Sequence, residues 1–250
     1  MDSIELVKKA IEFDGPERIP LDFLPPRYTD FCTVMNASVT QTKPKGKTGI
    51  YTDIWGCTWK TVDKSMGRPF ESPMKKWEDL KNFKFPDLLK EEDYEVAREI
   101  IAENSHRYII GGDPLIGLWE RAKALVGTSN FLTGLHLFPQ YVCELLDKLL
   151  DLQLQVIEKW SKLGVHGFMT WDDWGTENAL WISPHFWRKV FKPRYKKVAD
   201  TIHSYNMHYF FHSCGFILDI IPDLIEIGVD VLQIDQPELM GIEKLGNEFG

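Results

Sequence analysis

From residue 165 onward, short apolar segments alternate with longer segments that have helical periodicity. The predicted strands are 165–171, 207–211 and 229–234, and the predicted helices are 184–205, 217–227 and 241–249. Neighbouring parallel strands need a crossover connection of this kind, which is usually a helix. The alternation therefore predicts an α/β fold with a parallel sheet.

Three further strands are predicted in the first half of the chain. They cover residues 18–24, 49–53 and 108–112, and the second continues into a hairpin arm toward residue 59. The predicted helices here are 4–11, 74–82, 91–104, 115–126 and 139–163. Because a (β/α)8 TIM barrel has eight strands, we expect a single barrel domain over residues 1–250 that is truncated after six strands, without strands seven and eight. Strands one and six would then lack their closing neighbours, which predicts aggregation or a partner such as a second copy in a homodimer.

The composition of the chain argues against a nucleic-acid partner, a membrane span and a disulfide framework. The chain has 29 Lys and Arg against 37 Asp and Glu, a net charge of -8, which argues against nucleic acid. The N-terminus has charged residues where a signal peptide needs an apolar block, and no apolar run is long enough to span a membrane. We therefore expect a cytoplasmic protein. Its four cysteines include no CxxC pair, so free thiols are predicted.

Catalytic residues of (β/α)8 barrels lie at the C-terminal ends of the strands, and polar residues gather at these positions here. They are Asp22, Asp53, Cys57, Asp113, Asp172, Asp173, His212, Cys214, Asp235 and Gln236.

His212 and Cys214 form the most specific pattern among them. Side chains two residues apart on an extended segment point to the same face, and imidazole and thiolate are both zinc ligands. A zinc-bound thiol is deprotonated at neutral pH, so such a site could make a nucleophile from a weak acid. The alternative is a buried cysteine beside a hydrogen-bonded histidine.

The carboxylic acids Asp172 and Asp173 lie between Trp171 and Trp174. Large apolar neighbours favour a raised pKa in at least one of them, and that one could act as a general acid. The alternative is that Asp173 caps a turn while Asp172 hydrogen-bonds to the backbone. Asp53 is a weaker candidate, because a single aspartate at a strand end is more often a cap or a surface residue.

Four segments of the chain form a pattern by their order and spacing. They are Asp-Asp-Trp-Gly at 172–175, Ile-Ser-Pro at 182–184 with Phe186 and Pro193, Phe-His-Ser-Cys-Gly at 211–215, and residues 221–232. Together they resemble the uroporphyrinogen decarboxylase superfamily, especially its methyltransferase-like branch of cobalamin-dependent and zinc-dependent enzymes. The resemblance implies a barrel whose central cleft holds a porphyrin-derived or corrinoid-bound substrate.

In the methyltransferase branch, a His-x-Cys motif and a second cysteine near the eighth strand bind zinc. The zinc activates a thiol that accepts a methyl group from a corrinoid carried by a partner protein. The resemblance places His212 and Cys214 at the first two ligand positions, whereas the third has no counterpart in this chain. We therefore expect weak zinc binding and little turnover from residues 1–250, with Asp172 or Asp173 as the acid or the group that orients substrate.

The decarboxylase branch is the alternative that the resemblance leaves open. Its N-terminal Arg-Gln-x-Gly-Arg-Tyr signature is reduced here to Pro-Arg-Tyr at 26–28, although its essential aspartate, which holds the pyrrole N–H groups of a tetrapyrrole, matches Asp53. A tetrapyrrole with many carboxylates needs several Arg or Lys side chains in the cleft. The third alternative is a non-catalytic module that handles a corrinoid.

Overall fold

The computed structural model of the chain describes residues 1–23, 28–35, 49–61, 67–112 and 117–250. At its centre is a five-stranded parallel sheet in the order β1-β5-β6-β7-β8. These strands are β1 (Phe31–Met35), β5 (Tyr108–Gly112), β6 (Gly167–Trp171), β7 (His208–Ser213) and β8 (Val231–Ile234). Within this sheet the spatial order follows the chain order, although the described strands that come between β1 and β5 in the chain belong to a second sheet. The fold is α/β, and the sheet has the topology of consecutive units of a (β/α)8 barrel.

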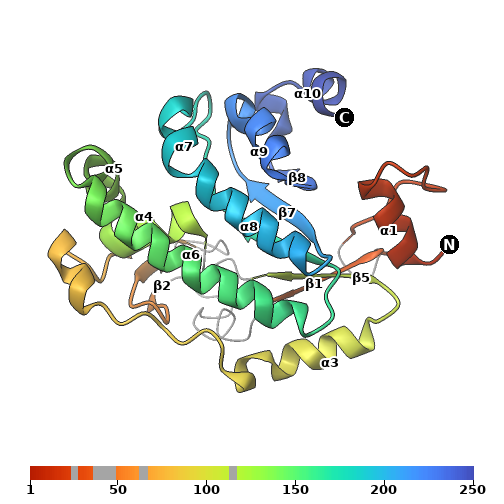
Figure 1. Ribbon diagram of the computed structural model, residues 1–250, viewed down its shortest axis with the longest axis horizontal. Coiled ribbons are helices and arrows are strands. Elements are labelled where there is room, and N and C mark those ends of the chain that lie inside the picture. The colour runs from red at the N-terminus through yellow and green to blue at the C-terminus, as the bar shows by residue number, and fades with distance from the viewer. Residues whose placement is uncertain (24–27, 36–48, 62–66, 113–116) are drawn as a thin grey trace.

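Helices connect these strands and cover the sheet (Figure 1). They are α1 (Ser3–Ile11), α3 (Glu95–Glu103), α4 (Leu118–Val126), α5 (Thr128–Leu137), α6 (Pro139–Ser161), α7 (Pro184–Val190), α8 (Lys192–Ser204), α9 (Ile221–Ile227) and α10 (Ile242–Phe249). Short 3-10 helices are η1 (Trp77–Asn82), η2 (Glu91–Tyr94), η3 (Leu218–Ile220) and η4 (Pro237–Leu239). Helices α6 and α8 run side by side, and they contact β5 and β7 respectively. None of the helices in the described ranges is long and apolar enough to cross a membrane.

Four of the six predicted barrel strands are confirmed, and two predictions are wrong. Residues 18–24 were expected to form the first strand, but residues 18–23 form no strand, since Pro20 lacks a backbone N–H and Ile19 is 81% exposed. The first strand of the sheet is instead β1, which pairs with β5. Residues 49–53 contribute β2 (Gly49–Thr52), but this strand belongs to a separate sheet.

This second sheet is antiparallel and contains β2, β3 (Thr58–Thr61) and β4 (Arg68–Glu71). The predicted hairpin arm after residue 53 is confirmed as β3. The long helix predicted at 184–205 is divided into α7 and α8, because Pro193 in the first turn of α8 has no N–H with which to continue α7. Helix α7 is capped by Ser183, whose side chain accepts a hydrogen bond from the Phe186 backbone N–H.

An aromatic cluster fills the core between the end of β6 and the helices α4, α7 and α8. The Trp119 and Trp174 rings are stacked with centroids 4.3 Å apart, and Phe191 packs edge-on against Trp174 at 4.5 Å. Trp187 and Tyr195 complete the cluster, and all five side chains are buried. Because Trp174 is part of the Asp-Asp-Trp-Gly segment, this packing anchors the loop that follows β6.

Candidate metal centre

The segments that follow β6 and β7 remain hydrogen-bonded to each other beyond the strands. The Asp172 backbone N–H donates to the His212 carbonyl at 3.1 Å, and the Gly175 N–H donates to the Cys214 carbonyl at 3.1 Å. In return, the Cys214 N–H donates to Asp173 Oδ1 at 3.0 Å. The two motifs noted in the sequence, at 172–175 and 211–215, are therefore neighbours in space.

Both motifs end in glycine because their backbones touch. A Cβ atom on Gly175 would lie 2.3 Å from the carbonyl carbon of Gly215, and a Cβ on Gly215 would lie 2.5 Å from that of Gly175. Gly215 also has a φ of +79°, which disfavours other residues. Only glycine at both positions lets the two loops approach this closely.

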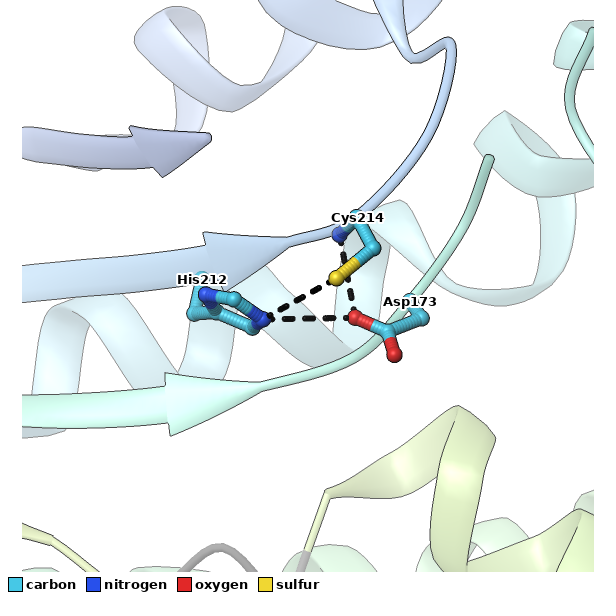
Figure 2. Close-up of side chains that lie close together, drawn as sticks. All are labelled: Asp173, His212 and Cys214. Carbon is cyan, nitrogen blue, oxygen red and sulfur yellow. Dashed lines mark hydrogen bonds and ion pairs between the residues drawn. The ribbon is translucent and has the colours of Figure 1, made fainter. Parts of the chain in front are cut away.

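Figure 2 shows that Asp173, His212 and Cys214 converge on one point at the ends of β6 and β7. His212 Nε2 lies 3.5 Å from Cys214 Sγ and 3.4 Å from Asp173 Oδ1, and one ligand atom from each residue lies within 4.8 Å of the others. In a tetrahedral zinc site with bonds of about 2.0–2.3 Å, neighbouring ligand atoms are about 3.3–3.6 Å apart. The two contacts of His212 match the edges of such a tetrahedron.

Electrostatics at the site favour a bound cation. Burial, followed by the negative charges of Asp173 and Asp235, raises the pKa of the Cys214 thiol to about 12. Burial is the largest single influence on the pKa values of Asp173 and His212, and it opposes the charged form of each. Their mutual hydrogen bond acts against burial, together with Cys214 on Asp173 and with Gln233 and Asp235 on His212, so the pKa of Asp173 is lowered and that of His212 is raised. The thiol is therefore protonated in the absence of a positive ion beside it, and a divalent metal would supply the charge that makes it a thiolate.

Comparison with known proteins places the chain in a family. A family model described as uroporphyrinogen decarboxylase (URO-D) matches residues 51–245. The chain belongs to the uroporphyrinogen decarboxylase family. Among solved structures, a methyltransferase from Methanosarcina mazei is similar in fold, with a TM-score of 0.61 and 18% sequence identity over 96% of this chain. The chain spans 66% of the length of that protein. No curated protein sequence matches it.

Asp172, the other half of the predicted acidic pair in this URO-D chain, points away from His212. Its fully buried carboxylate accepts hydrogen bonds from the backbone N–H groups of Leu118, Trp119 and Glu120 and from the Tyr195 hydroxyl, at 2.6–2.9 Å. Burial raises the pKa of Asp172 to about 7 against these hydrogen bonds. These contacts cap the first turn of α4, so they indicate that Asp172 stabilises the fold and favour the expected alternative of a carboxylate that is hydrogen-bonded to the backbone.

Asp53, the residue that matches the decarboxylase aspartate, lies in the turn between β2 and β3. Its carboxylate accepts from the backbone N–H groups of Trp55 and Cys57, each at 2.9 Å, and from the indole N–H of Trp59. It also forms a buried ion pair with Arg121 at 2.8 Å. These four partners hold the turn against α4.

The remaining strand-end candidates have different surroundings. Cys57 is buried beside Arg121 at 3.5 Å, and Asp22 accepts a hydrogen bond from Thr29 at 3.2 Å. Asp113 lies outside the described residues. Asp235 and Gln236 do reach the site, where Cys214 Sγ donates to Asp235 Oδ2 at 3.7 Å and the Gly215 N–H donates to Gln236 Oε1 at 2.8 Å.

The sequence interpretation missed two features of this centre. Asp173 was assigned an acid or orienting role, whereas its position makes it a third metal-ligand candidate within this chain. Gln233, which contacts His212 from β8, was not singled out. The available signal was a lone polar residue in the otherwise apolar segment 231–234.

Proposed function

We propose that this protein is a methyltransferase that moves a methyl group between a corrinoid, carried by a partner protein, and a thiol. Asp173, His212 and Cys214 would hold a zinc ion for this purpose. The observation that carries the proposal is the spacing of the ligand atoms, with His212 Nε2 at 3.5 Å from Cys214 Sγ and 3.4 Å from Asp173 Oδ1. A set of one sulfur, one nitrogen and one oxygen donor suits zinc and leaves a fourth position for substrate.

Bound zinc would lower the pKa of a substrate thiol and supply a thiolate at neutral pH. The protein's own residues fix where that thiolate stands. Asp173 is held by the Cys214 backbone N–H, and the loops that carry both residues are locked together at Gly175 and Gly215. The sulfur–methyl bond would then form as the bond from methyl to its carrier breaks, with the electron pair of the broken bond left on the carrier.

Access from the same edge of the sheet supports a substrate or partner arriving there. An open pocket of about 670 Å³ is bordered by the loops that follow β6, β7 and β8. Its lining includes Gly215, which follows Cys214 directly, Gly175, which lies two residues after Asp173, and Gln236, which accepts a hydrogen bond from the Gly215 N–H. We propose that the methyl carrier approaches on this side.

The surroundings of Asp53 argue against the decarboxylase alternative. A decarboxylase aspartate has to offer its oxygens to pyrrole N–H groups, but Asp53 already has four donors within the protein and is 6% exposed. The candidate metal centre carries the acidic side chains Asp173 and Asp235 rather than cations. Acidic side chains would repel a substrate that bears many carboxylates.

Metal analysis of the purified chain tests the proposal. Because Asp173 offers the third ligand that the sequence pattern lacked, we expect near-stoichiometric zinc in place of weak binding, and loss of zinc in each of Asp173→Ala, His212→Ala and Cys214→Ala. Cys143→Ala is a matched control, because this free cysteine lies on α6, and it should keep its zinc. Retention of zinc by all three site variants would refute the proposed centre.

An activity assay tests the reaction itself. The chain is incubated with methylcobalamin as the methyl donor and 2-mercaptoethanol as the acceptor, and the S-methyl product is measured by mass spectrometry. We expect product with the wild type and none with Cys214→Ala. A metal-free protein that consumes uroporphyrinogen would replace the proposal with decarboxylation, and inactivity in both assays with intact corrinoid binding would favour a corrinoid-handling module.

A further inference from the structure

The end of β8 runs alongside the candidate metal centre. In the register of the parallel pair, His212 of β7 lies opposite Gln233 of β8. Gln233 and Asp235 are two residues apart, so an extended chain would direct both side chains to the same face. That face is the one on which His212 and Cys214 lie.

A continuous set of contacts joins these side chains. His212 Nδ1 contacts Gln233 Oε1, and Gln233 Nε2 donates a hydrogen bond to Asp235 Oδ1 at 2.7 Å. The other carboxylate oxygen, Asp235 Oδ2, lies 3.7 Å from Cys214 Sγ. His212 uses its second ring nitrogen, Nε2, toward Asp173 and Cys214.

The polarity of this chain of contacts follows from which groups can donate. A carboxylate only accepts hydrogen bonds, so Asp235 requires the NH2 group of the Gln233 amide to face it. The amide oxygen must then face His212, and because this oxygen also only accepts, Nδ1 of the imidazole must carry the proton. In the neutral ring this leaves the lone pair on Nε2, which is the nitrogen that faces Asp173 and Cys214, so Nε2 donates to the Asp173 carboxylate only when the ring is doubly protonated.

We propose that Gln233 and Asp235 are positioning residues that fix His212 in the tautomer with the proton on Nδ1 and so present Nε2 to a metal ion. This inference rests on the metal centre of the proposed function. Gln233 orients the ring directly, and Asp235 acts through Gln233 by setting the direction of its amide. Outer-shell partners of this kind change metal affinity by about 10–100-fold when they are removed.

The tautomer can be observed without any metal. Long-range 1H–15N spectra of the metal-free protein, at a pH high enough for a neutral imidazole, distinguish a protonated from an unprotonated ring nitrogen. In the wild type we expect Nδ1 of His212 to be protonated and Nε2 to be unprotonated. Gln233→Leu should give a mixture or the opposite tautomer, and Asp235→Asn should weaken the preference, because an asparagine amide can both donate and accept.

Gln233→Glu separates positioning from a merely structural role. It is made together with Asp235→Asn, so that the new carboxylate accepts from both His212 Nδ1 and the asparagine NH2 group, and this double variant should keep the wild-type tautomer. It also keeps the test decisive if Gln233→Leu fails to fold. Gln155→Leu is the same change on α6, at a side chain whose hydrogen bond among the described residues goes to Asp151 of the same helix, and it should leave the tautomer unchanged.

Zinc titration gives the second readout. We expect the affinity of Gln233→Leu for zinc to fall by about 10–100-fold relative to the wild type, while Gln155→Leu is unaffected. A wild-type His212 with its proton on Nε2, or a Gln233→Leu protein with the wild-type tautomer, would overturn the inference. A wild type that binds no zinc but has the expected tautomer would instead refute the proposed function and leave the tautomer assignment standing.

Discussion

Replacing Asp172 with alanine should destabilise the protein strongly. The substitution removes the acceptor of four buried donors, which are the backbone N–H groups of Leu118, Trp119 and Glu120 and the hydroxyl of Tyr195. A buried donor without a partner costs about 1–3 kcal/mol, and loss of a helix N-cap costs about 1 kcal/mol. Because relaxation will satisfy some of these groups, we expect the free energy of unfolding to fall by about 4 kcal/mol, as for other broken buried networks.

Urea unfolding followed by circular dichroism at pH 8 measures this loss. With an m value of about 3 kcal/mol/M, a loss of about 4 kcal/mol lowers the midpoint by roughly 1.3 M. Asp172→Asn retains an acceptor oxygen for the helix and should lose about half as much. As a control, Asp147→Ala removes an exposed ion pair with Arg194 and should cost less than about 1 kcal/mol.

The same variants separate a structural from a catalytic role for Asp172. If its carboxylate caps α4, Asp172→Asn should bind zinc and turn over substrate in proportion to its folded fraction. A variant with wild-type stability that has lost activity would refute this reasoning and make Asp172 the catalytic acid expected from the sequence.

Three further perturbations give distinct results. In metal-free protein the pKa of Cys214 is raised to about 12, so its alkylation by iodoacetamide at pH 8 should be at least roughly 100-fold slower than that of free cysteine. Asp173→Asn removes a negative charge and should speed this alkylation. Mass spectrometry of the Cys214 peptide measures both rates, and equal rates in the wild type and Asp173→Asn would contradict the charge argument. Gly175→Ala, whose Cβ would lie 2.3 Å from backbone, should cost about 2–3 kcal/mol in urea unfolding, whereas Gly246→Ala meets nothing within 4 Å and should not destabilise. A hydrogen bond from Arg18 holds the pKa of the buried Asp30 well below its usual value. The stability that the ionised Asp30 gives to the folded protein is therefore present above about pH 4 and is lost as the pH falls further. Unfolding curves between pH 6 and about pH 2 should therefore show a smaller acid loss in Asp30→Asn, and an equal loss would count against this assignment.

The strands from 108 onward could be predicted from the sequence because each is a short apolar run bounded by glycine or by a helix. Residues 18–24 have the same apolar character, yet Pro20 and the exposed Ile19 leave residues 18–23 outside the sheet. Residues 49–52 do form a strand, but only the paired structure reveals that it belongs to the smaller antiparallel sheet. Apolar patterning predicts a strand without identifying its neighbour.

The candidate centre was only partly predictable for a similar reason. The spacing of His212 and Cys214 put them on one face, but the adjacent acids Asp172 and Asp173 could not be told apart. Successive residues of an extended segment point in opposite directions, and here one carboxylate turns toward α4 while the other turns toward His212. The contact of Gln233 with His212 depends on the β7–β8 register, which is a tertiary property.

X-ray absorption at the zinc edge tests the central claim most directly, because it identifies the atoms bound to the metal. For the zinc-loaded protein we predict one sulfur at about 2.3 Å together with nitrogen and oxygen ligands at about 2.0–2.2 Å. Zinc that still binds to Cys214→Ala when the metal is in excess should lack the sulfur, and zinc that still binds to Asp173→Ala should have a changed first shell. Zinc surrounded only by nitrogen and oxygen in the wild type, or a spectrum unchanged by Cys214→Ala, would contradict a metal centre formed by Asp173, His212 and Cys214.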